Sequence, residues 1–182
     1  MKILVVVDMQ NDFIDGVLGT KEAQNIVGKV VNEILDPKYD EVFYTMDTHD
    51  DVNYLNTIEG RHLPVKHCIK DTKGHQLCEV VEKALANNKV NSYKVPKFHF
   101  GSATLARAIR EDIVDCEEPN NEIYIVGLCT DICVIANAIL IQNSTAAYGT
   151  EINVISSLCA GTTPENHNAA LQVMKSLQIN VL

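Results

Sequence analysis

Short apolar runs alternate with amphipathic stretches along the whole chain. The apolar runs are brief and rich in β-branched residues, as strands buried on both faces of a parallel sheet are. They are Ile3–Val7, Val42–Met46, Val90–Val95, Ile123–Val126 and Ile152–Ile155, with Ile179–Leu182 as a candidate edge strand. Helical periodicity covers Lys21–Leu35, His75–Ala86, Ser102–Asp112, Asp131–Gln142 and Pro164–Leu177. This alternation predicts an α/β fold with right-handed βαβ crossovers and helices on both faces of the sheet.

Length, charge and cysteine usage narrow the class of protein. The 182 residues fit one domain, 1–182, without repeats or linkers. A net charge of −9 disfavours a nucleic-acid partner. The apolar run Ile3–Val7 is too short for a signal peptide or a membrane span. Nothing implies secretion, so the six cysteines are expected to be thiols. We therefore expect a cytoplasmic protein with a small-molecule ligand and no membrane partner.

Polar side chains follow four of the predicted strands. They are Asp8, Asp47 with His49, Lys94 with Lys97, and the segment 128–133. In doubly wound sheets, ligands bind at the carboxyl ends of the strands. These groups should therefore converge on one rim, and this convergence is the strongest indication of a site that the residues provide.

Cys133 lies where the chain leaves a strand and enters a helix. In the first turn of a helix, unpaired N–H groups and the helix dipole favour a thiolate and lower the pKa of the cysteine. The same N–H groups can hold the oxyanion of a tetrahedral intermediate. A buried cysteine packed behind the sheet is the alternative. A Cys129–Cys133 redox pair is another, although dithiol redox sites have C-x-x-C spacing.

Asp8 and a lysine are the candidate helpers of this thiol. Asp8 follows a run of valines, and its carboxylate could take the thiol proton and later deliver it to a leaving amine. A lysine at the third strand end would keep Asp8 ionised. The alternatives are a turn aspartate and a solvated surface lysine.

The polar segment after the second strand offers metal ligands. Asp47-Thr48-His49 is followed by His67, with Glu59 between them. One carboxylate and two imidazoles can bind one ion. The alternative is that these are water-exposed loop residues.

Two motifs resemble the hallmarks of the isochorismatase-like cysteine hydrolases. Val-Val-Asp-Met-Gln-Asn-Asp-Phe (6–13) and Gly-Leu-Cys-Thr-Asp-Ile-Cys-Val (127–134) occur in the order and spacing of that family. The resemblance implies a six-stranded, mainly parallel, Rossmann-like sheet with an Asp–Lys–Cys triad. Asp8 would be the general base and acid, and Cys133 the nucleophile. A cis peptide would fall at Leu128–Cys129, with the amides of Cys129 and Cys133 forming the oxyanion hole.

The family's lysine pattern fits Lys97 best, because an aromatic and a small residue follow it at Phe100 and Gly101. Lys94 remains the alternative under a different alignment.

Within the family, the chain is most similar to the nicotinamidase and pyrazinamidase branch. Those enzymes carry an Asp-x-His…His-Cys metal site that Asp47, His49 and His67-Cys68 match, with Glu59 near an additional ligand. The resemblance implies a divalent ion, with zinc first and manganese or iron as alternatives. Residues 163–167 are also nicotinamidase-like.

One feature departs from that branch. Nicotinamidases usually have an aromatic residue just before the last metal histidine, whereas residues 63–66 here are Leu-Pro-Val-Lys, and the chain lacks tryptophan. Phe13 and Phe100 remain as ring contacts.

The resemblance implies hydrolysis of nicotinamide to nicotinate and ammonia through a thioester. The alternatives are another small amide or carbamoyl substrate, and a catalytically silent binding module. Homo-oligomers are common in the family, so we expect one here.

Overall fold

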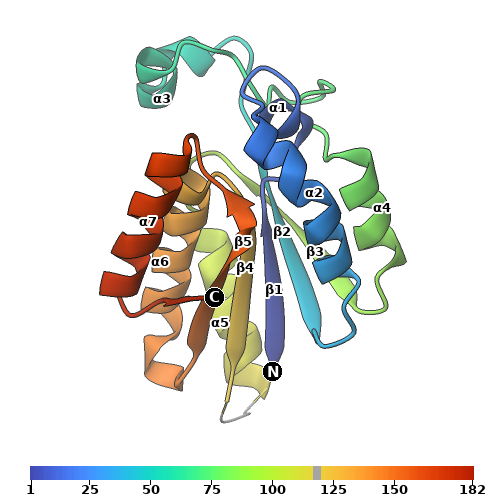
Figure 1. Ribbon diagram of the computed structural model, residues 1–182, viewed down its shortest axis with the longest axis vertical. Coiled ribbons are helices and arrows are strands. Elements are labelled where there is room, and N and C mark those ends of the chain that lie inside the picture. The colour runs from blue at the N-terminus through green and yellow to red at the C-terminus, as the bar shows by residue number, and fades with distance from the viewer. Residues whose placement is uncertain (117–119) are drawn as a thin grey trace.

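Six parallel strands form the centre of the protein in the order β3-β2-β1-β4-β5-β6 (Figure 1). The computed structural model describes residues 1–116 and 120–182. The strands are β1 (Lys2–Val7), β2 (Glu41–Asp47), β3 (Asn91–Lys97), β4 (Glu122–Leu128), β5 (Glu151–Ala160) and β6 (Asn180–Val181). Each described pair of neighbouring strands runs parallel. The expected Rossmann-like order is therefore confirmed.

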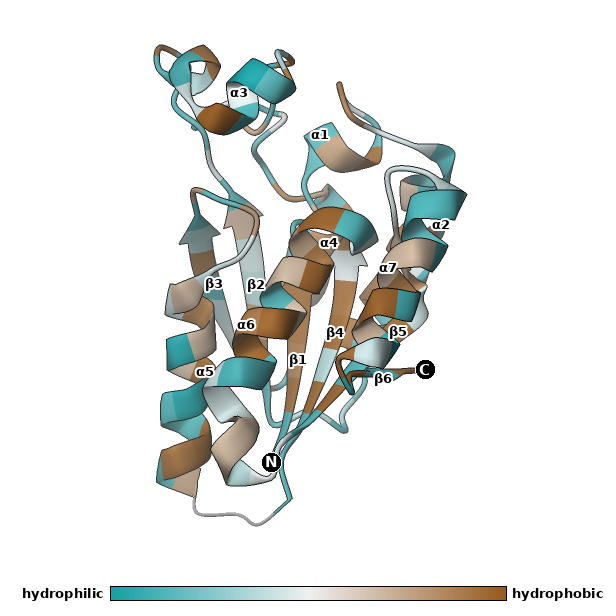
Figure 2. Cartoon of the chain, turned by 90° about the vertical axis from the view of Figure 1, so that its left-hand side faces the viewer, coloured by the Kyte–Doolittle hydropathy of each residue, from teal (hydrophilic) through white to brown (hydrophobic). Residues whose placement is uncertain are grey.

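Helices cover both faces of this sheet and enclose two apolar cores. Successive residues of β1 point into opposite cores: Ile3 and Val5 into one, Leu4 and Val6 into the other. The central strands are accordingly apolar along their length (Figure 2). The first core is covered by α5 (Ala103–Cys116), α6 (Ile135–Thr145) and α7 (Pro164–Ser176). The second is covered by α1 (Asn11–Ile14), α2 (Lys21–Ile34) and α4 (Glu79–Asn87).

Several element ends differ from those expected. α4 begins at Glu79 rather than His75, because residues 73–76 form a turn and Leu77 pairs with Gln10 in an isolated bridge. The predicted helix from Asp131 begins instead as a π-helical turn, η2 (Thr130–Val134), which continues into α6. α7 is capped by Thr163, whose side chain accepts a hydrogen bond from the Asn166 amide.

The junction of β1 and β4 requires a glycine. Gly127 has φ +116°, and a Cβ at this position would lie 2.2 Å from Val7 O. A larger residue would push β4 away from the end of β1. One residue further along, the Leu128–Cys129 peptide is cis, as the family resemblance implies.

The long segment after β2 projects above the carboxyl edge of the sheet (Figures 1 and 2). It contains two short helices, η1 (Tyr54–Asn56) and α3 (Ile58–His62). A further 3-10 turn, η3 (Ala146–Tyr148), follows α6. None of the helices among residues 1–116 and 120–182 is both long and apolar enough to cross a bilayer.

Candidate active site

Asp8 lies directly after β1 and is fully buried. Its backbone has φ +48°, a left-handed conformation that is uncommon for aspartate and often found at functional sites. Thr45 on β2 makes two hydrogen bonds to Asp8, one to its side chain and one to its backbone. The Thr45 hydroxyl donates to Asp8 Oδ1 at 2.6 Å and accepts from the Asp8 amide at 3.1 Å. Burial raises the pKa of Asp8, while the Lys97 charge opposes the rise.

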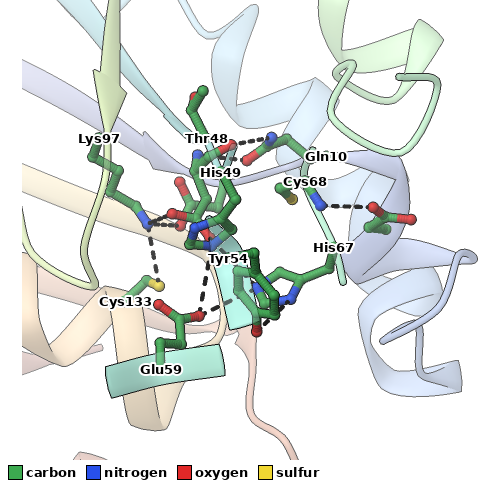
Figure 3. Close-up of polar contacts among 12 residues, drawn as sticks. Gln10, Thr48, His49, Tyr54, Glu59, His67, Cys68, Lys97 and Cys133 are labelled. Atoms are coloured by element: carbon green, nitrogen blue, oxygen red, sulfur yellow. Dashed lines mark hydrogen bonds and ion pairs between the residues drawn. The ribbon is translucent and has the colours of Figure 1, made fainter. Parts of the chain in front are cut away.

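Lys97, the last residue of β3, connects the polar groups of the site (Figure 3). Its Nζ lies 2.7 Å from Asp8 Oδ2, 3.2 Å from Asp47 Oδ1 and 3.4 Å from Cys133 Sγ. Burial alone would lower the pKa of Lys97, but the Asp8 charge and the other anionic partners raise it well above its usual value. The ammonium therefore stays charged although only 2% of the residue is exposed.

Lys94 occupies a different position. It lies in the middle of β3, is exposed, and lines a separate cavity of about 500 Å³ with Tyr44 and His75. The structure thus brings Lys97, not Lys94, to Asp8 and Cys133.

Cys133 lies in the η2 turn and is buried beside Lys97. Burial raises the pKa of this thiol well above its usual value, and the Asp8 charge raises it further. The expectation of a lowered pKa is therefore wrong, because desolvation and a neighbouring anion outweigh the helix start and Lys97. A neutral thiol next to a carboxylate has a base at hand to take its proton.

Four side chains from three segments, the end of β2, α3 and the loop after α3, form a cluster with metal-ligand chemistry. One ligand atom from each of Asp47, His49, Glu59 and His67 lies within 4.8 Å of the others. His49 Nε2 lies 2.9 Å from Asp47 Oδ2, and His67 Nε2 lies 3.3 Å from Glu59 Oε1. Asp47 and His49 come from the end of β2, whereas α3 supplies Glu59. Two imidazoles and two carboxylates suit zinc, manganese or iron.

Neighbouring groups orient these ligands. The Gln10 side chain donates to Asp47 O at 2.8 Å and accepts from the Asp47 amide at 2.7 Å. His67 Nδ1 lies 2.9 Å from Val65 O, which leaves its Nε2 facing the cluster. A hydrogen bond at the ring nitrogen that faces away from the ion fixes the tautomer of a metal-binding histidine. Tyr54, whose hydroxyl lies 3.3 Å from the same Nδ1, supports this orientation.

The electrostatics of the cluster favour a cation. Burial alone would raise the pKa of Asp47, but hydrogen bonds to His49 and His67 and the charge of Lys97 lower it well below its usual range. Burial alone would lower the pKa of His67, but hydrogen bonds to Asp47 and Glu59 raise it to about 10. Both shifts show that the two carboxylates stabilise positive charge at this point, which a divalent ion can supply. The donor set therefore fits the metal that the sequence implies.

Cys133 and the four side chains of the cluster line the same cavity, of about 1110 Å³. Phe13 is buried and lines this cavity, with its ring centroid 5.4 Å from that of His67. Phe100 lines the rim and is 45% exposed. Cys129 also lines the cavity, and burial raises its pKa to about 12. The expected site residues thus share one cavity, apart from Asp8 and Lys97, which lie beneath it against Cys133.

Sequence reasoning assigned no role to three polar side chains that support the site: Gln10, Thr45 and Asn137. Gln10 lies inside the first motif, and Thr45 precedes Asp47 by two residues, so that both point to one side of β2. These signals were available in the sequence. Asn137, four residues after Cys133, has no comparable signal.

Comparisons with known proteins agree with this geometry. The sequence matches the isochorismatase domain over residues 2–182. The chain belongs to the isochorismatase domain family. A nicotinamidase of Schizosaccharomyces pombe is 26% identical over 215 residues, covering 98% of this chain and 91% of the relative.

Two solved structures illustrate the likeness in three dimensions. The pyrazinamidase/nicotinamidase of Streptococcus mutans has a TM-score of 0.78 and 28% identity, with both chains fully covered. The pyrazinamidase of Pyrococcus horikoshii, solved in complex with zinc, has a TM-score of 0.74 and 23% identity, covering 100% of this chain and 98% of that one. This isochorismatase-family chain therefore shares its whole fold with these enzymes.

Proposed function

We propose that this protein is a metal-assisted amidohydrolase that converts nicotinamide to nicotinate and ammonia through a thioester on Cys133. The observation that carries the proposal is the contact of Lys97 with Asp8, Cys133 and the metal-ligand Asp47 at once. This contact supports the proposed roles, because it brings the proposed nucleophile and base together beside a candidate metal ligand. The similarity to nicotinamidases supports the choice of nicotinamide.

The proposed reaction uses Asp8 twice as a proton carrier. Cys133 Sγ attacks the carboxamide carbon, and Asp8 takes the thiol proton. Asp8 then protonates the amide nitrogen, the C–N bond breaks, and ammonia leaves a thioester. Water attacks the thioester carbon while Asp8 takes a proton, the C–S bond breaks, and that proton returns to the sulfur. The positive charge of Lys97 keeps Asp8 able to act as a base.

Other groups of the cavity bind and orient the substrate. The amides of Cys129 and Cys133 hold the oxyanion, and Phe13 packs against the ring. Asp47, His49, Glu59 and His67 would hold the divalent ion, which when bound acts as a Lewis acid toward the pyridine nitrogen. The small-molecule partner is thus fixed at both ends, at its ring nitrogen and at its carboxamide.

A larger or different amide is the second candidate substrate. The cavity, at about 1110 Å³, exceeds the roughly 300–1,000 Å³ of most small-ligand pockets. The segment before His67 also lacks the aromatic residue that would narrow it.

Three further expectations belong to the proposal: a single domain over 1–182, a homo-oligomer and a cytoplasmic location. The six cysteines, all of them described, are free thiols, which supports a reducing compartment. Light scattering of the purified protein will measure the number of subunits.

Ammonia release from nicotinamide tests the proposed function directly. Cys133→Ala should lower kcat by about 10³-fold or more. Cys159→Ala is the matched control, because Cys159 is another buried thiol but packs in the core on β5, and it should retain most activity. An inert wild type that hydrolyses another amide would favour the second candidate. An inert wild type on a broad amide panel would favour a silent binding module.

Metal dependence is tested separately on the wild type. Dialysis against a chelator should abolish turnover, and zinc, manganese or iron should restore it. His67→Ala should prevent this restoration, whereas His62→Ala, at an exposed histidine of α3 outside the cluster, should not. Full activity after metal removal would contradict the role of the cluster.

A further inference from the structure

Asn137 is a fully buried side chain that joins three points of backbone. It lies on α6, four residues after Cys133. Its Nδ2 donates to Cys133 O at 2.7 Å and to Phe100 O at 3.2 Å. Its Oδ1 accepts from the Ser102 amide at 2.9 Å. One amide group thus connects the turn that carries the nucleophile with the segment 98–102.

The segment 98–102, here called the aromatic loop, forms one wall of the cavity. It begins directly after Lys97 and ends at Ser102, whose Oγ accepts from the Leu105 amide at the start of α5. Phe98 and Phe100 line the cavity but are 64% and 45% exposed. Their rings therefore bury little surface that could hold the loop in place.

The loop backbone lies close against α6. A Cβ at Gly101 would come within 2.6 Å of Leu140 Cδ1 and 3.3 Å of Ala136 O. At this contact the two bonds from Asn137 satisfy the Phe100 carbonyl and the Ser102 amide. Losing them would leave the buried Ser102 amide and the partly buried Phe100 carbonyl without these partners, which is costly.

We infer that Asn137 is a positioning residue that fixes the aromatic loop relative to Cys133 and thereby sets the affinity for the substrate ring. Cys133 itself is held by the η2 turn and by its apolar core neighbours. Removing the bonds to the loop should therefore weaken substrate binding more than it slows the chemical step. This inference rests on the proposed amidase function for its kinetic part only.

Two substitutions separate the loop bonds from the helix bond. Asn137→Ala removes all three bonds. Asn137→Thr should keep only the bond to Cys133 O, since Thr145 on the same helix makes such a bond to Ile141 O at 2.8 Å. The matched control is Asn143→Ala, because Asn143 also lies on α6 and donates to the carbonyl four residues earlier, Ile139 O, at 2.8 Å. Its side chain is exposed and its recorded bond stays within the helix.

The kinetic test is the split between KM and kcat. Both Asn137 variants should raise KM for nicotinamide by about 5–20-fold while kcat falls by no more than about 3-fold. Asn143→Ala should change neither. A KM equal to that of the wild type in a folded Asn137→Thr variant would overturn the inference, as would a fall confined to kcat.

Amide hydrogen exchange tests the tether without any substrate. Peptides covering residues 98–102 should exchange about 10-fold faster in both Asn137 variants and at the wild-type rate in Asn143→Ala. Unchanged exchange in the Asn137 variants would overturn the inference even if nicotinamide is the substrate. A wild type inert on nicotinamide would instead overturn the proposed function, and the KM comparison would then use whichever amide it hydrolyses.

Discussion

Lys97 Nζ lies 2.7 Å from Asp8 Oδ2, and both side chains are almost completely excluded from water. A buried carboxylate keeps its charge only beside a cation or strong hydrogen-bond donors. The pair therefore links stability to the proposed reaction, because the lysine that neutralises the buried charge of Asp8 also keeps this proposed general base ionised.

Lys97→Met should lower kcat/KM by about 10³-fold or more and destabilise the protein by about 3–5 kcal/mol, because it leaves Asp8 buried without its cation. Adding Asp8→Asn should recover much of the stability without recovering activity. Urea unfolding and ammonia release measure the two effects. Lys94→Met is the control, since Lys94 is exposed on the same strand. A larger loss from Lys94→Met would reverse the assignment of the lysine.

The positions of Asp8 and Cys133 could be predicted because they follow apolar strands whose carboxyl ends must meet. The choice between Lys94 and Lys97 could not be made in the same way. Strand β3 is an edge strand of sequence Asn-Ser-Tyr-Lys-Val-Pro-Lys. Because most of its residues are polar, its sequence does not show where the strand ends or which of its faces is buried.

The candidate metal ligands were also only partly predictable from the sequence. Asp47 and His49 follow a clear strand, but the position of Glu59 depends on α3, a short helix inside a polar loop. The pKa of Cys133 depends on burial by side chains from many elements, which spacing along the chain does not report. Local sequence patterns thus predict which residues follow the end of a strand, but not how completely those residues are buried from solvent.

Thr45 should control the pH dependence of activity through Asp8. Its hydroxyl donates to Asp8 Oδ1 and lowers the pKa of that carboxyl against the effect of burial. Thr45→Val therefore raises the pKa of Asp8 further, so that protonation removes the base at higher pH. The acid limb of the kcat/KM profile should move to higher pH, with a larger loss at mildly acidic than at mildly alkaline pH.

Thr45→Ser should restore the wild-type profile, because it keeps the hydroxyl. Thr145→Val, at another fully buried threonine, should lower stability without moving the acid limb. A parallel loss of activity at every pH in Thr45→Val would show that Thr45 acts on the fold alone.

The size of the cavity predicts tolerance toward substituted substrates. In a tight pocket, a misfit of one methylene costs roughly 10–200-fold in kcat/KM. Because this cavity is large, nicotinamides with one apolar ring substituent should keep kcat/KM within about 10-fold of the parent amide. Leu18→Trp adds volume to the cavity lining and should penalise the substituted amides more than nicotinamide. Equal effects of Leu18→Trp on all substrates would show that this part of the cavity binds none of them.

Two glutamates on strands flanking β1 should respond to pH with opposite signs. Glu41 begins β2, and burial together with the charge of Asp112 raises its pKa. Glu122 begins β4, where the Tyr124 hydroxyl and Lys2, whose Nζ is 3.3 Å from Glu122 Oε2, lower its pKa despite some burial. A raised pKa means that the folded state gains stability as pH falls, and a lowered pKa means that it loses stability.

Glu41→Gln should therefore raise the melting temperature at neutral pH, because ionised Glu41 destabilises the fold there. Glu122→Gln should lower it, because ionised Glu122 is stabilising. Both residues are partly exposed, so solvent screening keeps the shifts small, on the order of 1 °C. The Glu41 effect should vanish below the ordinary carboxyl pKa of about 4, whereas the Glu122 effect should persist to lower pH because the pKa of Glu122 is lowered in the folded state. Melting curves of the two variants across this range check the signs, and a lower melting temperature of Glu41→Gln at neutral pH would contradict the assignment.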